Sequence, residues 1–403
     1  MFVSFFPRPK IFFWSALLWT ALCMAVWYGF AGQLFQAPER VGGLATFVTP
    51  AALWYDAYYW ICVTIFAAFW MWFAPHPWAG WSIFGSALIL FASYFQVQIS
   101  VAINIEWRGP FYNLIQNAVS KPGSVTRPEL YDGALLFFNF ATVYVMVSVV
   151  NAFFISHYIF RWRTAMNNYY VANWPRLRTI EGASQRVQED TMRFATTMES
   201  LGVSLVRAML TLVAFLPLLV TLSGKITELP LIGPVPYSLV IVAVVWSLFG
   251  TGLLALVGIR LPGLEFFNQR VEAAYRKELV LGEDDPARAD PPTLSELFAA
   301  VRANYFRLYL NFLYFNVGRY FYGQTDVIVP YIILTPTLAA GAITLGVMQQ
   351  INNAFSEVRS SFQYLVTSWS TIVELISIYK RLLAFEARIH DEPLPSIEAK
   401  PAA

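Results

Sequence analysis

The sequence predicts an all-α integral membrane protein with eight transmembrane helices, and three observations support this class. Of its 403 residues, 57% are hydrophobic and only 13% are charged, about half the charged fraction of a typical soluble globular protein. Aromatic residues make up 17% of the chain. The basic residues gather in segments between long uncharged runs. This composition excludes a soluble enzyme, a disordered chain, a secreted disulfide scaffold and a nucleic-acid-binding protein.

Three spans are predicted before residue 106. The first runs from Ile11 to about Gly32. It exceeds the apolar part of a signal peptide and lacks a clear cleavage site, so we expect an uncleaved helix. No Asp, Glu, Lys or Arg occurs from Ala57 to Ile105. Because that run is too long for one span and the Pro-rich segment 74–80 interrupts it, two helices are expected, at about 54–74 and 82–105.

Five further spans follow from the same reasoning. They are expected at about 134–158, 205–224, 238–260, 304–340 and 344–383. The fifth span of the chain contains Pro217.

Positive charge predicts the orientation of these spans. The segments 160–207 and 260–307 each hold seven Lys or Arg residues, whereas the loops 33–53 and 225–237 hold one each. The positive-inside rule therefore places both termini in the cytoplasm. A helix from Pro292 to Pro330 would be roughly 57 Å long, against a hydrocarbon core of about 30 Å. We expect two helical excursions that project into the cytoplasm.

No cofactor or metal site is predicted. Cys23 and Cys62 both lie inside apolar runs, where they are expected to pack as small apolar residues. His76, His157 and His390 are far apart and lack ligand spacing. We find no catalytic constellation and no GxxxxGK[ST] loop, so a chain without its own ATPase or other enzyme activity is expected.

Polar residues recur along one stripe of the last predicted span. They are spaced by three or four residues: Gln350, Asn353, Glu357, Ser360, Tyr364, Thr367, Thr371 and Glu374. The opposite side carries apolar residues such as Phe355 and Phe362. A stripe of this length cannot face lipid, so it either lines an aqueous path or hydrogen-bonds to another helix.

The segment before the fifth span is also rich in charge. Glu189 precedes Arg193 by four residues, which favours an ion pair on a solvated helix surface, and Asp190 is expected on that surface too. Glu199 has no basic residue three or four positions away. It must find a partner on another helix, hold a proton or face water.

Two more charged pairs have simple interpretations. Arg319 and Asp326 lie two turns apart, and a structural ion pair, with each other or across helices, is favoured over a role in transport. Glu272 precedes Arg276 by four residues, which is typical of an exposed pair on a cytoplasmic helix.

Several unbroken stretches resemble one family. Residues 1–7 (MFVSFFP), 153–166 (FFISHYIFRWRTAM), 186–194 (RVQEDTMRF) and 262–266 (PGLEF) through 283–285 (EDD) closely resemble the SbmA/BacA peptide transporters of Gram-negative inner membranes. The resemblance covers nearly the whole chain, except for the loop 33–50 and the tail after about Arg388. It implies a homodimer in the bacterial inner membrane that imports peptides, including proline-rich and microcin-type antimicrobials, by a proton-driven cycle.

The resemblance also implies roles for particular residues. Cavity glutamates that handle protons in the family correspond to Glu189, Glu199, Glu272 and Glu283, and Glu374 has a matching acid in its helix. Glu357 has no clear match. Tyr112 matches the family in a segment expected on the outer side, where it either contacts peptide or anchors at the interface.

A weaker resemblance is to the membrane domain of exporter-type ABC transporters, in particular through residues 341–346 (GAITLG) and 186–194. It implies that the last six helices form an exporter-like domain. We expect an N-terminal two-helix segment at 1–80, this domain at 81–388 and a flexible tail at 389–403. Only 18 residues follow Phe385, so no nucleotide-binding domain is expected there. The alternative function is the membrane subunit of an ATP-driven exporter of lipids or very-long-chain fatty acids, with a separate ATPase subunit.

Overall fold

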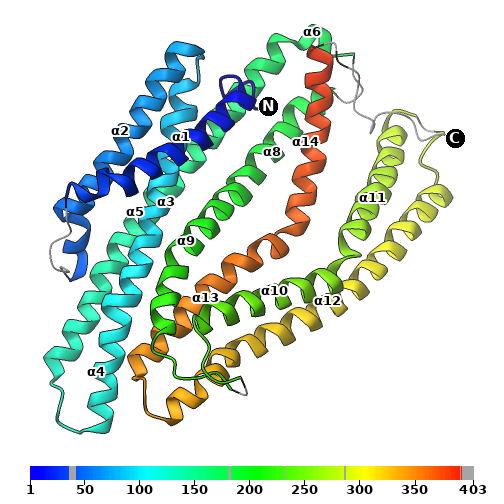
Figure 1. The fold of residues 1–403 in the computed structure, drawn as a ribbon. Coiled ribbons are helices and arrows are strands. Elements are labelled where there is room, and N and C mark those ends of the chain that lie inside the picture. Colours follow the sequence, from blue (N-terminus) through cyan, green and yellow to red (C-terminus); the bar gives the residue numbers. More distant parts are fainter. Residues whose placement is uncertain (36–41, 180–182, 231, 286, 391, 393–403) are drawn as a thin grey trace. The chain divides into compact units, whose positions relative to one another are not determined.

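A computed structural model describes residues 1–35, 42–179, 183–230, 232–285, 287–390 and 392. Across these ranges the chain forms helices and connecting turns, without a β-strand (Figure 1). It divides into two compact units. The first comprises residues 1–217, 344–354 and 374–403, and the second comprises 218–343 and 355–373. Three of the four boundaries fall within helices, namely α9 (Val203–Ser223), α13 (Leu345–Thr367) and α14 (Trp369–Ile389), and the fourth precedes α13.

The first unit contains the N-terminal helices. They are α1 (Pro9–Gly29), η1 (Ala31–Gln33), η2 (Gly43–Val48), α2 (Pro50–Phe73), η3 (Trp81–Gly85), α3 (Ser86–Ala102), η4 (Ile103–Arg108), α4 (Gly109–Ser120), α5 (Arg127–Ala172), α6 (Trp174–Leu177), α7 (Ala183–Gln185), η5 (Arg186–Asp190), α8 (Thr191–Thr197), η6 (Met198–Gly202) and most of α9 (Val203–Ser223). The start of α13 (Leu345–Thr367) and most of α14 (Trp369–Ile389) belong to the same unit.

The second unit is built around a long helix, α12 (Pro291–Ala339), which packs against α10 (Ser238–Gly258) and α11 (Leu261–Asp284) (Figure 1). Its remaining parts are the end of α9, most of α13 and the first residues of α14. Helix α12 contains both Pro330 and Pro336. It thus extends through the region where the sequence predicts a helix over 304–340.

Local sequence signals explain where several of these helices begin. Thr126 and Glu129 form a reciprocal capping box at the start of α5, in which the Thr126 N–H donates to Glu129 over 2.7 Å. Thr49 accepts from the Ala52 N–H at the start of α2, and Asp290 accepts from the Thr293 N–H at the start of α12. Each of these three helices also has a proline in its first turn, where the missing N–H costs nothing.

Two π-helical segments carry glutamates that the sequence analysis selected. Glu189 lies in η5 and Glu199 lies in η6, on the helical path that continues into α9. A π segment adds a residue to the turn and rotates the following side chains, and such segments occur often at functional sites. These two acidic residues are therefore held on locally widened helix.

The last predicted helix is two helices in the structure. Helix α13 ends at Thr367 and α14 begins at Trp369, so the expected single helix over 344–383 is interrupted at Ser368. The Thr367 hydroxyl donates to the carbonyls of Gln363 and Tyr364, at 3.2 and 3.1 Å. Bonds of this type from Ser and Thr to the preceding turn often bend helices, which accounts for a break at this point.

Six helical stretches of the described chain are long and apolar enough to cross a membrane. They are Pro9–Gln33, Pro50–Phe73, Trp81–Ser120, Arg127–Ala172, Arg186–Ser223 and Ser238–Gly258. They correspond to the first six predicted spans. Helices α12, α13 and α14 are not among the six, so the total of eight stays a prediction. The three-part division at 1–80, 81–388 and 389–403 also stays a prediction, and residues 391 and 393–403 lie outside the described chain.

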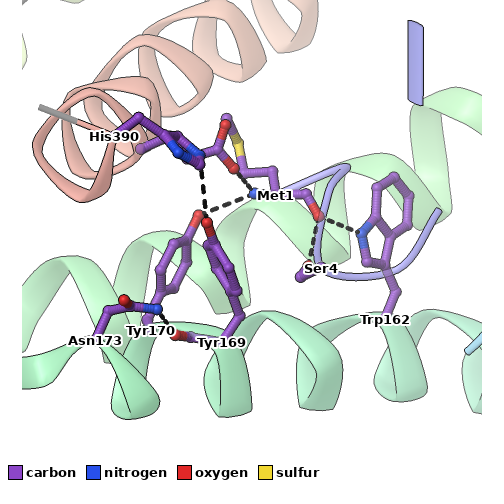
Figure 2. A network of polar contacts seen from close by, with 8 residues as sticks. Met1, Ser4, Trp162, Tyr169, Tyr170, Asn173 and His390 are labelled. Carbon is purple, nitrogen blue, oxygen red and sulfur yellow. Dashed lines mark hydrogen bonds and ion pairs between the residues drawn. The ribbon is translucent and has the colours of Figure 1, made fainter. Parts of the chain in front are cut away.

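An aromatic core joins the chain's first residues to α5 and α14. Phe5 is fully buried and stacks on Trp162 of α5, with 5.8 Å between ring centroids. Figure 2 shows the polar contacts beside it. The Met1 amino group donates to the Tyr170 hydroxyl over 3.2 Å and pairs with Glu386 of α14, while the Met1 carbonyl accepts from Trp162. These contacts hold α14 against the end of α5 within the first unit.

Candidate functional site

Two of the predicted glutamates come together around one arginine in the first unit. Arg193 of α8 pairs with Glu189 of η5 at 2.7 Å, as its spacing predicts. The same guanidinium lies 3.9 Å from Glu374 of α14. All three side chains are partly exposed. One cation is thus shared by two carboxylates that are far apart in the sequence and belong to different helices.

Asp190, next to Glu189, is buried and paired, which corrects the expectation of a solvated surface residue. Arg381 of α14 approaches it with two parallel bonds, Nε to Oδ2 at 3.0 Å and Nη2 to Oδ1 at 2.9 Å. Asp190 is 5% exposed. The prediction failed because neighbouring residues of one helix do not share a face, so Asp190 turns inward while Glu189 stays accessible. A bidentate pair of this kind fixes η5 against α14.

Glu199 has a partner on another helix, which is one of the three predicted alternatives. The Ser156 hydroxyl of α5 donates to the Glu199 carboxylate over 2.6 Å. Glu199 is half-buried and makes no ion pair with the described part of the chain. The hydrogen-bond partner of Glu199 is thus a neutral hydroxyl, whereas Glu189 and Glu374 lie beside a cation.

The second unit holds a charged pair of its own. Asp326 of α12 pairs with Arg359 of α13, and the Trp246 indole of α10 donates to the same carboxylate over 2.9 Å. Asp326 is only 4% exposed and Arg359 21%. The predicted structural ion pair at Asp326 is thus formed across helices, with Arg359 in the place considered for Arg319.

A tyrosine extends this network along α13. The Tyr322 hydroxyl donates to the Trp246 carbonyl over 3.2 Å and accepts from Gln363 over 2.6 Å. Its ring stacks on the Trp246 indole, with 5.3 Å between centroids. We name the set Trp246, Tyr322, Asp326, Arg359 and Gln363 the Asp326 network. It connects α10, α12 and α13 through polar groups that a hydrocarbon environment would otherwise leave unsatisfied.

Glu272 and Glu283 lie on α11 of the second unit. Glu272 is half-buried and Glu283 is exposed. Neither forms an ion pair with another described residue, so the expected pair between Glu272 and Arg276 is not observed. The nearest ion pair on α11 joins Glu278 to Arg288, over 3.2 Å.

The predicted polar stripe serves several different contacts. Gln350 and Asn353 belong to the first unit, residues 357–371 to the second, and Glu374 again to the first. The Gln350 amide donates to the carbonyls of Asn104 and Ile105, at 3.0 and 3.2 Å. Both carbonyls belong to the π segment η4, where the i→i−4 bonding is interrupted. At this position the stripe is used for helix packing, which is one of the two predicted alternatives.

The hydroxyls of the stripe are satisfied locally. Ser360 donates to the Glu357 carbonyl over 3.0 Å, as Thr367 does to its own preceding turn. Asn353, Glu357, Tyr364 and Thr371 are half-buried. An aqueous path along residues 357–371 stays a prediction.

Tyr112 lies in an aromatic group on α4. Its ring meets Trp107 and Phe111 edge to face, each at 6.2 Å between centroids. Residues that follow Tyr112 on α4 bind the start of α13. The Asn113 side chain accepts from the Gly346 N–H over 2.9 Å, and the Gln116 side chain accepts from the Leu345 N–H over 2.8 Å. The choice between peptide contact and interfacial anchoring for Tyr112 stays open.

Three residues that the sequence analysis did not select are central to these sites. They are Ser156, Arg359 and Arg381. A signal existed for Arg381, because it follows Glu374 by seven residues and so continues the same helix face. Ser156 had none, since a serine in an apolar span is ordinary. In the described part of the chain, His, Cys, Asp and Glu residues do not gather into any group of three that could hold a metal ion.

Comparison with known proteins places these features in a family. The model of the SbmA/BacA-like family matches residues 75–390. Curated relatives include ABC transporter D family member 2 of Arabidopsis thaliana chloroplasts, 24% identical over 246 residues, and an uncharacterized ABC transporter ATP-binding protein of Synechocystis sp., 24% identical over 238 residues. A third, from Haemophilus influenzae, is 22% identical over 281 residues.

The aligned parts cover 56%, 57% and 65% of this chain, in the same order. They span only 33%, 34% and 46% of the relatives' own lengths. With its several apolar helices and a membrane transporter family, the chain is a multi-pass membrane protein.

Proposed function

Because the chain belongs to the SbmA/BacA-like family, we propose that it is a proton-driven importer of peptides, including antimicrobial peptides, in the bacterial inner membrane. It works as a homodimer by alternating access, and its acidic residues carry the coupling protons. The observation that best supports this proposal is the sharing of Arg193 by Glu189 and Glu374. In this arrangement the protonation of a carboxylate changes a contact between two helices.

The chemistry of the cluster supports such a cycle. A proton that neutralises Glu374 weakens its attraction to Arg193 and leaves that cation to Glu189. The contact between α8 and α14 then loosens, while the bidentate pair of Asp190 and Arg381 still holds η5 against α14 nearby. Glu199, beside the neutral Ser156 hydroxyl, is a second proton acceptor on the same path. One proton that moves inward contributes about 2.3 kcal/mol per 100 mV of membrane potential.

Acidic side chains also suit the cargo. A cleft lined by one sign of charge concentrates ligands of the opposite sign, so carboxylates favour cationic peptides. The energy source is then the proton gradient, and the chain itself carries out no ATP hydrolysis.

The test is uptake of a labelled cationic peptide into proteoliposomes with an imposed inward proton gradient. We expect accumulation that stops when a protonophore collapses the gradient; uptake that persists after full collapse would refute the coupling.

Replacement of Glu199 tests the proton path directly. Glu199→Gln keeps the side-chain shape and the contact with Ser156 but cannot exchange a proton. We expect gradient-driven peptide uptake to fall at least tenfold, about 1.4 kcal/mol of barrier, while the oligomeric state on size-exclusion chromatography is unchanged. Glu296→Gln is the matched control, since Glu296 is an exposed acid near the start of α12. Wild-type uptake by the Glu199 variant would remove this residue from the path.

The proposal includes eight spans, with α12 and the α13–α14 pair as the seventh and eighth. The last six form an exporter-like membrane domain, and both termini lie in the cytoplasm. The distribution of Lys and Arg supports this orientation. The 49-residue length of α12 supports a span that continues beyond the bilayer.

A second function is favoured by the names of the relatives. Each of the three is called an ABC transporter protein. The chain would then be the membrane subunit of an ATP-driven exporter of lipids or very-long-chain fatty acids, with a separate ATPase subunit. Co-purification of the chain with an ATPase subunit, together with ATP-dependent lipid export that survives collapse of the proton gradient, would favour this alternative.

A further inference from the structure

A cleft of about 610 Å³ lies beside the C-terminal part of α5 in the first unit. One wall is formed by Phe160, Arg163, Asn167 and Val171 of α5. The facing wall comes from Trp174 and from the helical run that includes Gln188. The cleft is separate from the Glu189–Arg193–Glu374 cluster, whose residues do not line it.

Four of the side chains that line this cleft carry donors without an acceptor among the described residues. The Arg163 guanidinium, the Asn167 amide, the Trp174 indole and the Gln188 amide make no side-chain hydrogen bond or ion pair with described residues. By contrast, nearby Arg161 stacks on Trp81, with 4.0 Å to the ring centroid. Asn167 and Gln188 are exposed, and Arg163 and Trp174 are half-buried, so all four donors are accessible to a ligand in the cleft.

The charge of the cleft determines the sign of that ligand. Arg163 is the one charged residue among the described residues that line it, and none of them is acidic. A planar guanidinium binds phosphate through two parallel bonds, and amide and indole N–H groups add neutral donors. This set matches a group with several acceptor oxygens and a single negative charge, which is the charge of a phosphodiester.

An apolar surface leads from the cleft along α5. Phe160, Asn167 and Val171 lie at intervals of seven and four residues and so share one face of the helix. Phe153 and Met146 precede Phe160 by seven and fourteen residues on the same face, and both are exposed. This stretch belongs to a helix long and apolar enough to cross a membrane. A ligand with a phosphodiester head and an apolar tail would therefore contact one continuous surface.

We propose that this cleft binds the head group of an anionic phospholipid. Arg163 pairs with the phosphodiester, Asn167, Trp174 and Gln188 donate to its oxygens, and an acyl chain lies along Phe160, Phe153 and Met146. From Phe160 to Met146 the helix rises roughly 21 Å, more than the half-thickness of about 15 Å that an acyl chain occupies. Basic pockets between helices at the cytoplasmic surface bind anionic lipid head groups in this way. The lipid site is independent of the transported substrate and of the energy source.

Native mass spectrometry of the detergent-solubilised full-length chain tests the proposal. The protein is titrated with phosphatidylglycerol and with phosphatidylcholine of identical acyl chains. We expect the wild type to retain phosphatidylglycerol preferentially, and Arg163→Gln to lower that preference about fivefold. Arg178→Gln is the matched control, because Arg178 is an exposed arginine of the same region that does not line the cleft. It should keep the wild-type preference.

Two further measurements distinguish a lipid head group from free phosphate, and a lost contact from a folding defect. Asn167→Leu removes a donor but no charge, so it should lower the preference for phosphatidylglycerol less than Arg163→Gln does. Circular dichroism should show that this variant stays folded, even if the arginine variant unfolds. Inorganic phosphate should fail to displace the bound lipid. Equal retention of the two lipids by the wild type, an unchanged preference in both cleft variants, or full displacement by inorganic phosphate would overturn the proposal.

Discussion

Asp326 is a carboxylate that the second unit buries among three helices. Its charge is compensated by Arg359 and by the N–H of Trp246. Removal of a charge from water costs several kcal/mol, and the pair offsets that cost only while both partners are present. The Asp326 network therefore makes the stability of this unit depend on single side chains.

Disruption of one partner should be more damaging than neutralisation of both. We expect Arg359→Gln to lower the free energy of unfolding by about 3–5 kcal/mol, because it leaves a buried carboxylate without its cation. The double variant Asp326→Asn with Arg359→Gln should recover much of this loss. Thermal unfolding of the detergent-solubilised protein measures both. A double variant as unstable as Arg359→Gln alone would show that the pair is not the source of the effect.

The acidic residues of the first unit show how partners divide similar side chains into different roles. Asp190 is buried in a bidentate pair with Arg381, Glu189 and Glu374 share an accessible arginine, and Glu199 accepts from a hydroxyl. Among these acids only Glu199 makes no ion pair with described residues. Under the proposed function Glu199→Gln is therefore the sharper test of coupling, because the replacement breaks no ion pair.

At the level of elements, α4 and the start of α13 fit closely. The side chains of Asn113 and Gln116 satisfy two backbone N–H groups in the first turn of α13, which have no acceptor within that helix. The backbones approach so closely that a Cβ at Gly346 would overlap the Gly109 carbonyl oxygen. Glycine is therefore required at position 346, because any side chain there would clash with α4.

This contact predicts opposite outcomes for two glycines. Gly346→Ala should lower the free energy of unfolding by about 1–3 kcal/mol, because the added methyl group has no space. Gly323→Ala is the matched control in the interior of α12, where nothing lies within 4 Å of an added Cβ. It should be neutral or stabilising, since Ala has the higher helix propensity. Equal thermal unfolding midpoints for the two variants would contradict the close approach.

At the level of the whole molecule, the arrangement in the membrane follows from charge. The turn around Gly123 lies between α4 and α5, and the turn around Ala287 lies between α11 and α12. With the eight spans and cytoplasmic termini that we propose, the positive-inside rule predicts the first turn outside and the second in the cytoplasm.

Cysteine labelling tests this arrangement. With Cys23 and Cys62 replaced by alanine, an impermeant maleimide should label Gly123→Cys in intact cells. It should label Ala287→Cys only after the membrane is permeabilised. Labelling of both positions in intact cells would refute eight spans with cytoplasmic termini.

The sequence alone determined the class of the protein, its first six apolar helices and its family. Those properties depend on composition and on residues that are close together in the sequence. They follow from the 13% charged fraction, from uncharged runs long enough to span a bilayer, and from unbroken stretches such as 186–194. The pair of Glu189 and Arg193 was predictable for the same reason, because four residues make one turn of a helix.

Only the tertiary structure decided which distant residues became partners. It joined Asp190 to Arg381, Asp326 to Arg359 and Glu199 to Ser156. It also interrupted the last helix at Ser368 and assigned Gln350 to packing against η4. Helix periodicity states which face a side chain occupies but not which helix packs against that face. That choice depends on the packing of whole helices, which local periodicity does not describe.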